Sequence, residues 1–124
     1  MLNLSHKNLD VYKMSLKLIE EVYKATKEFP KEELYVLVSQ IRRAAISVCS
    51  NIAEGASRIS KKEKKRFYEV SRSSLVEMDT QFEIAIILHY YKKGQMKELE
   101  QYLESTFRML SKMIGNLNVN PTNH

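Results

Sequence analysis

Apolar side chains recur at steps of three and four along most of the chain, the spacing that predicts amphipathic helices. Four such segments can be marked: about Leu9 to Glu28, about Lys31 to Ser57, Ser60 to Lys93, and about Met96 to Leu117. The expected core stripes are Tyr12, Leu16, Ile19, Val22, Tyr23 and Thr26, then Leu34, Leu37, Val38, Ile41, Ala45, Val48 and Ile52, then Phe67, Val70, Leu75, Met78, Phe82, Ala85 and Leu88, and finally Leu99, Leu103, Phe107, Leu110 and Ile114. Short links make consecutive helices antiparallel neighbours. The sequence therefore predicts an all-α, antiparallel up-down-up-down four-helix bundle that forms a single domain over residues 1–117, followed by a flexible polar tail over 118–124.

Local signals mark the ends of these segments. Pro30 disfavours helix at Phe29 and separates the first segment from the second. Ser60 and Glu63 have the spacing of a capping box, which predicts the start of the third helix. Gly94 is expected to stop that helix after Lys93.

The composition excludes several classes of protein. With 44% hydrophobic and 28% charged residues, the 124-residue chain has the balance of a globular domain. Only 3 Gly and 2 Pro are present, too few for the turns of a β-sandwich or barrel. No apolar run approaches the ~20 residues of a membrane span, and the N-terminus lacks the ~7–15 apolar residues of a secretory signal. Cys49 has no cysteine partner, so we expect a cytoplasmic protein in which Cys49 is a small buried hydrophobe.

The net charge of +5 is local. Residues 58–72 carry 7 basic and 2 acidic side chains, whereas residues 1–57 carry 8 and 7, and residues 73–124 carry 5 and 6. On a helix, all these basic residues except Lys64 point away from the expected core. We call the six outward ones the basic cluster: Arg58, Lys61, Lys62, Lys65, Arg66 and Arg72. This geometry favours binding of RNA or DNA through phosphates, with little sequence preference. It is equally the geometry of a solvated helix face, or of a structural scaffold whose basic rim contacts an acidic protein partner.

A second, polar face follows the second segment. Its members fall within about 80° of one another: Val36, Gln40, Arg43, Ser47, Asn51 and Glu54. Arg43 and Glu54 are ~16 Å apart along the axis and cannot pair within their own helix. We therefore expect partners on another helix or another subunit, with Glu54 or Glu77 able to offer a carboxylate to a buried arginine. The predicted polar seam consists of Gln40, Arg43, Ser47, Asn51, Glu54 and Glu77. The alternative is a solvated polar face.

The sequence offers no catalytic constellation. His6, His89 and His124 lie far apart, and there is no Glu-x-x-His pair or Cys/His cluster with metal-ligand spacing. The three glycines are isolated and form no phosphate-binding loop. We predict a protein that is not an enzyme, with no catalytic residue, metal or cofactor.

The run from Gln40 to Gly55, QIRRAAISVCSNIAEG, resembles the signature of bacterial four-helix bundle proteins associated with intervening sequences in 23S ribosomal RNA genes. Residues 22–30, 58–60 and 73–77 fit the rest of that pattern, so the resemblance covers about residues 9 to 115. Two departures are Cys49-Ser50, where the family commonly has Pro-Ala, and Ser73, where Gly is usual.

The resemblance implies that the bundle assembles as a homopentameric ring. It also implies kinship with the accessory variability protein of diversity-generating retroelements, a basic pentamer that engages a reverse transcriptase and nucleic acid. A reverse transcriptase is thus a candidate protein partner by resemblance alone.

Overall fold

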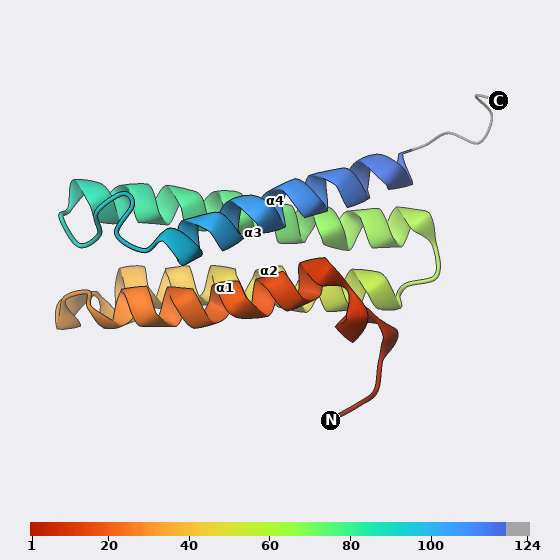
Figure 1. Ribbon diagram of the computed structural model, residues 1–124, viewed down its shortest axis with the longest axis horizontal. Helices are drawn as coiled ribbons and strands as arrows, with labels where there is room; N and C mark the ends of the chain where they lie inside the picture. The colour runs from red at the N-terminus through yellow and green to blue at the C-terminus, as the bar shows by residue number, and fades with distance from the viewer. Residues whose placement is uncertain (119–124) are drawn as a thin grey trace.

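Four long helices run alternately up and down in the computed structural model, which describes residues 1–118: α1 (Asp10–Lys27), α2 (Ser39–Ser57), α3 (Lys61–Ile87) and α4 (Lys97–Leu117) (Figure 1). α1 and α3 each pack against both α2 and α4, and the described residues contain no strand. The predicted four-helix bundle is confirmed. The start of α1, the α2–α3 turn and the end of α4 all lie at one end of the bundle (Figure 1).

Most predicted helix boundaries are confirmed, because the sequence signals that set them act locally. α1 follows a short 3₁₀ turn, η1 (Ser5–Asn8), and both α1 and α4 begin and end within a residue of the prediction. The hydroxyl Oγ of Ser60 accepts a hydrogen bond of 3.0 Å from the backbone N–H of Glu63, which confirms the predicted N-cap of α3. Apart from Asn118, the predicted polar tail lies outside the described residues.

The second segment does not begin as an α-helix. After Pro30 the chain forms a 3₁₀ turn, η2 (Lys31–Glu33), and then a π-helical turn, η3 (Leu34–Val38), before α2 starts. A π turn has a wider i→i+5 repeat, so side chains before Leu37 fall out of phase with the stripe of α2. Leu34, predicted as core, is exposed for this reason.

The predicted end of the third helix is wrong. α3 stops at Ile87, where the N–H of Tyr90 donates to the carbonyl of Ala85 (2.8 Å) and that of His89 donates to Ile86 (3.0 Å). This is the hydrogen-bond pattern of a Schellman motif, and its left-handed position is held by His89 (φ 65°) instead of a glycine. Gly94 (φ 84°) belongs to the following loop.

The core face of α1 is rotated relative to the predicted stripe, whereas α3 departs from its stripe only near its two ends. Leu75, Met78, Phe82 and Ala85 of α3 are buried as predicted. Predicted core residues that are exposed are Leu16, Tyr23, Val70 and Leu88. The side chains that replace them in the core of these two helices include Val11, Ser15, Leu18, Ala25, Tyr68 and Ser71. Two of these are serines, which the sequence pattern assigned to the polar side.

α2 and α3 form the most extensive helix pair of the bundle. Two features bring their backbones close. The hydroxyl of Ser71 on α3 donates to the carbonyl of Val48 on α2 (2.7 Å). The ring of Tyr68 lies directly over Gly55, where an added Cβ atom would stand 2.7 Å from a ring carbon. The small residues of α2 thus serve a close interhelical approach.

Candidate nucleic-acid interface

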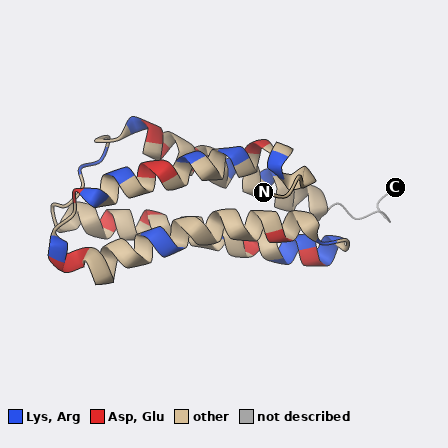
Figure 2. Cartoon of the chain, turned by 90° about the horizontal axis from the view of Figure 1, so that it is seen from below, with Lys and Arg blue, Asp and Glu red and all other residues tan. Residues whose placement is uncertain are grey.

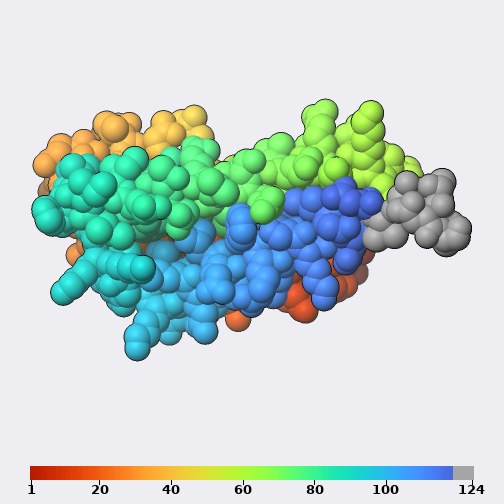
Figure 3. Space-filling view, turned by 90° about the horizontal axis from the view of Figure 1, so that it is seen from above, coloured from red at the N-terminus to blue at the C-terminus, as the bar shows by residue number. Residues whose placement is uncertain are grey.

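The turn between α2 and α3 presents the basic cluster at one end of the bundle. Only residues 58–60 connect the two helices, and Arg58 takes an extended conformation (φ −78°, ψ 151°) that reverses the chain. Lysine and arginine residues are concentrated where α3 begins, whereas α2 is largely uncharged (Figure 2). In the space-filling view, side chains from the region around residue 60 stand out from the surface at this end (Figure 3).

Lys64, which was expected to lean towards the core, joins the two helices. Its Nζ donates to the carbonyl oxygen of Ala56 at 3.0 Å, in the last turn of α2. A cation at this position satisfies a free carbonyl and complements the negative end of the α2 dipole. Lys64 is therefore structural, whereas the neighbouring Lys61 and Lys62 are exposed.

Two arginines of the cluster are held in place by one ring. The guanidinium carbon of Arg58 lies 4.8 Å from the centre of the Phe67 ring, and that of Arg66 lies 5.3 Å from it. Both distances are within cation–π range. Phe67 is half-buried and was predicted as core; the core position belongs to its neighbour Tyr68, whose pKa is raised by burial. The Phe67 ring instead packs against the guanidinium groups of Arg58 and Arg66 at the surface.

The six residues of the basic cluster do not all come together. Arg58, Lys61, Lys62 and Arg66 are exposed around the turn, and Lys65 is half-buried beside them. Arg72 lies further along α3, and its guanidinium covers the ring of Phe107 on α4 at 4.6 Å. Arg72 is therefore directed to the α3–α4 side of the bundle.

The predicted polar seam divides into a packed part and an exposed part. Ser47 shares a hydrogen bond of 2.9 Å with Ser74 of α3, a partner that the sequence pattern does not identify. The amide Nδ2 of Asn51 donates to the carbonyl of Ser47 at 2.8 Å and to its hydroxyl at 3.0 Å. The exposed members are Gln40, Arg43, Glu54 and Glu77.

The two charges of the seam have different surroundings. Glu54 forms an ion pair with Arg58, one turn further along the chain, at 3.1 Å. Arg43 has no salt bridge among residues 1–118. The Ser47–Ser74 contact sets the antiparallel register, and one turn from it Arg43 and Glu77 lie at about the same level of the bundle. Glu77 accepts a hydrogen bond from Gln81 at 3.3 Å.

The remaining candidate chemistry is structural. Cys49 is buried, as predicted, and His6 packs edge-on against Tyr12 with ring centres 4.7 Å apart. His89 occupies the turn that ends α3, and His124 lies outside the described residues. Within residues 1–118 no group of three or more His, Cys, Asp or Glu side chains could hold a metal ion. No described helix is long and apolar enough to cross a membrane.

Comparison with known proteins supports both the motif and the fold. The family model described as 23S rRNA-intervening sequence protein matches residues 7–112. A crystal structure of a protein of unknown function from the S23 ribosomal protein family of Bacteroides thetaiotaomicron superimposes with a TM-score of 0.76. That alignment covers 85% of this chain and 95% of the other at 20% identity, so it bears on the fold alone. No curated protein matches the chain.

Proposed function

Because the chain belongs to the 23S rRNA-intervening sequence protein family, we propose that it is a non-enzymatic scaffold that binds RNA or DNA by the phosphate backbone. The observation that carries this proposal is the concentration of exposed cations at the α2–α3 turn. Residues 58–72 hold 7 basic and 2 acidic side chains, which equals the net charge of the whole chain.

The arrangement of the cluster suits phosphates better than bases. Lys61 and Lys62 are exposed, whereas Arg58 and Arg66 are oriented by the Phe67 ring. Guanidinium groups fixed in this way lose little conformational freedom when they grip a phosphate. The Phe67 ring is occupied by these two arginines, so it supplies little open surface for base stacking. Binding should then depend on backbone charge and tolerate any sequence.

The test compares two triple variants with the same change of charge. Lys61→Gln/Lys62→Gln/Lys65→Gln removes three cations of the cluster. The control, Lys27→Gln/Lys31→Gln/Lys97→Gln, removes three exposed lysines at the opposite end of the bundle. Affinity for mixed-sequence RNA and DNA is measured by fluorescence anisotropy between about 50 and 200 mM salt, where phosphate binding weakens steeply.

We expect the cluster variant to bind all sequences more weakly. The slope of log affinity against log salt should flatten by about 0.7–0.9 for each phosphate that the variant no longer neutralises. The control should keep both its affinity and its slope. Absence of salt-dependent binding by the wild type at about 50 mM salt would end the nucleic-acid proposal. The alternative function, a structural scaffold whose basic rim contacts an acidic protein partner, would then replace it.

We further propose that the copies assemble as a homopentameric ring, with Arg43 of the polar seam at the contact between copies. The support is the exposed Arg43 without an ion pair among the described residues, beside small residues of α2. If a neighbouring subunit buries Arg43 against a carboxylate, Arg43→Ala should cost about 3–5 kcal/mol and lower the mass found by light scattering. Arg108→Ala, which breaks an exposed pair with Glu104 on α4, is the matched control. A wild-type mass near 14.5 kDa would contradict the ring.

A further inference from the structure

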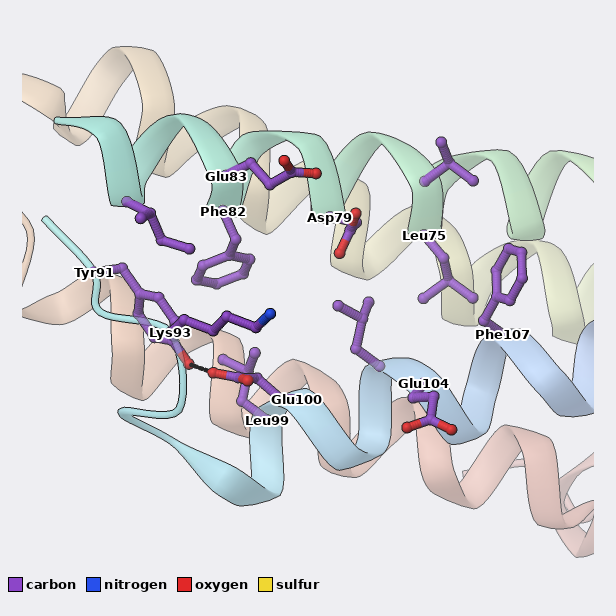
Figure 4. A pocket seen from close by; sticks show the side chains of 13 residues that line it. Leu75, Asp79, Phe82, Glu83, Tyr91, Lys93, Leu99, Glu100, Glu104 and Phe107 are labelled. Carbon is purple, nitrogen blue, oxygen red and sulfur yellow. Dashed lines mark hydrogen bonds between the residues drawn. The ribbon is translucent and has the colours of Figure 1, made fainter. Parts of the chain in front are cut away.

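An open groove of about 730 Å³ runs between α3 and α4, towards the end of the bundle opposite the basic cluster (Figure 4). Its floor consists of core side chains that are only 1–5% exposed, namely Leu75, Phe82 and Leu99. The apolar lining that stays more accessible is Val76, Leu103 and Phe107. Along α3 the lining extends from Leu75 to Ile86, which is about 16 Å or three helical turns. Val76 of α3 also lines the groove and is 52% exposed.

Carboxylates line both sides of this groove. Asp79 and Glu83 come from α3, and Glu100 and Glu104 come from α4. Within each pair the residues are four apart, so both lie on the same helix face, an arrangement of like charges that destabilises a helix. One lysine, Lys93, is in the lining, and its side chain extends between the two walls (Figure 4).

The two walls differ in how far their charges are already satisfied. Glu100 accepts hydrogen bonds of 2.7 Å from the hydroxyl of Tyr91 and from the backbone N–H of Gly94. Glu104 pairs with Arg108 at 3.0 Å. Asp79 and Glu83 are exposed and form no salt bridge within residues 1–118. The α3 wall is therefore the place where a further cation would be stabilised.

We propose that this groove binds a cationic amphipathic helix of a partner protein. A helix of about 11 residues matches the three-turn length, and apolar side chains at i, i+3, i+4 and i+7 would pack on Val76, Leu103 and Phe107. Lysine or arginine residues flanking that stripe would face Asp79 and Glu83. The occupant is identified by charge complementarity, because Asp79 and Glu83 are exposed and form no salt bridge within residues 1–118.

Two other occupants fit the groove less well. Phosphates of a nucleic acid would meet the four carboxylates and be repelled. The basic start of α3 from a second copy has its apolar side, including Tyr68 and Leu75, packed in its own core. The exposed apolar side chains there are Ile59 and Val70, which do not make a stripe at i, i+3, i+4 and i+7. The proposal is independent of the nucleic-acid function of the basic cluster.

The test uses a fluorescein-labelled 14-residue peptide made only of leucine and lysine, with the leucines on one helix face. Its affinity for the full chain is measured by anisotropy, beside a scrambled peptide of the same composition. Asp79→Asn/Glu83→Gln removes the free carboxylates, and Val76→Gln alters an exposed apolar position of the groove without touching the core. Glu20→Gln/Glu28→Gln, on α1 and at its C-cap, makes the same change of charge elsewhere on the surface.

We expect saturable binding that is specific for the amphipathic order of the peptide. The Asp79/Glu83 variant should bind at least about fivefold more weakly, as removal of two ion pairs implies, and Val76→Gln should also weaken binding. The α1 control should match the wild type. The proposal is overturned if both peptides bind equally or neither binds, or if the Asp79/Glu83 variant equals the α1 control. A change in oligomer mass on Asp79→Asn/Glu83→Gln would also overturn it, since the groove would then be a contact between copies.

Discussion

Substitution of Gly55 by alanine tests the close packing of α2 on α3, from which the α2–α3 turn and its charges are built. A Cβ atom at Gly55 would lie 2.7 and 2.9 Å from two carbons of the Tyr68 ring. Carbon atoms in contact are ordinarily about 3.5–4.0 Å apart. Tyr68 is a core residue that is only 5% exposed, and because protein interiors are close-packed its ring must displace neighbouring side chains to move. Gly115 on α4 is the matched control, because a Cβ there meets nothing within 4 Å.

The expected magnitudes follow from two opposing effects. Within a helix, alanine is favoured over glycine by about 1 kcal/mol, and this gain applies at both positions. Overpacking at Gly55 costs about 1–3 kcal/mol, and this cost applies at Gly55 alone. Gly115→Ala should therefore raise the free energy of unfolding by up to about 1 kcal/mol. Gly55→Ala should lower it by up to about 2 kcal/mol.

Urea unfolding followed by circular dichroism measures both variants, with and without Tyr68→Leu. Removal of the ring should abolish the clash, so Gly55→Ala should become neutral or stabilising in the Tyr68→Leu background. Such a coupling between two contacting residues is what a double-mutant cycle isolates. The reasoning is refuted if Gly55→Ala is as stable as Gly115→Ala, or if its cost is the same with and without the Tyr68 ring.

Three further predictions concern single contacts. His89→Gly should raise the free energy of unfolding by about 1 kcal/mol because glycine adopts positive φ without strain, whereas His89→Ala should give no such gain in urea melts. Burial, and then the hydrogen bond to Glu100, raise the pKa of Tyr91 above its ordinary value, so the neutral hydroxyl is favoured in the folded state. That stability is complete below about pH 10 and is lost as the pH rises further. The stability advantage of wild type over Tyr91→Phe should therefore be constant from about pH 8 to about pH 10 and shrink above about pH 10. A difference that stays constant up to about pH 11 would contradict this. Glu54→Gln should cost no more than about 1 kcal/mol, because Glu54 and Arg58 are 55% and 44% exposed, and the cost should vanish in high salt in thermal melts.

The helix pattern was predictable because its signals are short-range. Pro30 ends the first helix, the Ser60–Glu63 cap begins the third, and apolar periodicity identifies each segment. Each signal acts within about one helical turn, so no knowledge of the neighbouring helices is needed. The cap and the number of helices are confirmed on these grounds.

The faces of the helices were harder to predict because buried hydroxyl groups resemble surface residues in a sequence. Ser15 donates to the carbonyl of Tyr12 (2.7 Å), and Thr106 donates to the carbonyl of Tyr102 (2.6 Å). A hydroxyl satisfied by its own helix can be buried at little cost. A pattern that counts Ser15 as polar therefore moves the expected core stripe of α1 towards the wrong side.

The basic cluster and the groove between α3 and α4 also differ in how well the sequence predicts them. The basic cluster is contiguous in the sequence, so counting charges by segment locates it at residues 58–72. The carboxylates of the groove between α3 and α4 come from two helices. Counting charges by segment does not reveal them, because residues 73–124 as a whole carry 5 basic and 6 acidic side chains. Its position also depends on the end of α3. Because His89 turns the chain after Ile87, Tyr91 returns to pack on Phe82 with ring centres 5.0 Å apart and holds Glu100 at the α4 wall. Had the helix continued to Lys93, as the sequence predicted, this end of the groove would not close. Because the end of the groove depends on the positive φ of His89, its position could be found only from the folded structure and not from the sequence.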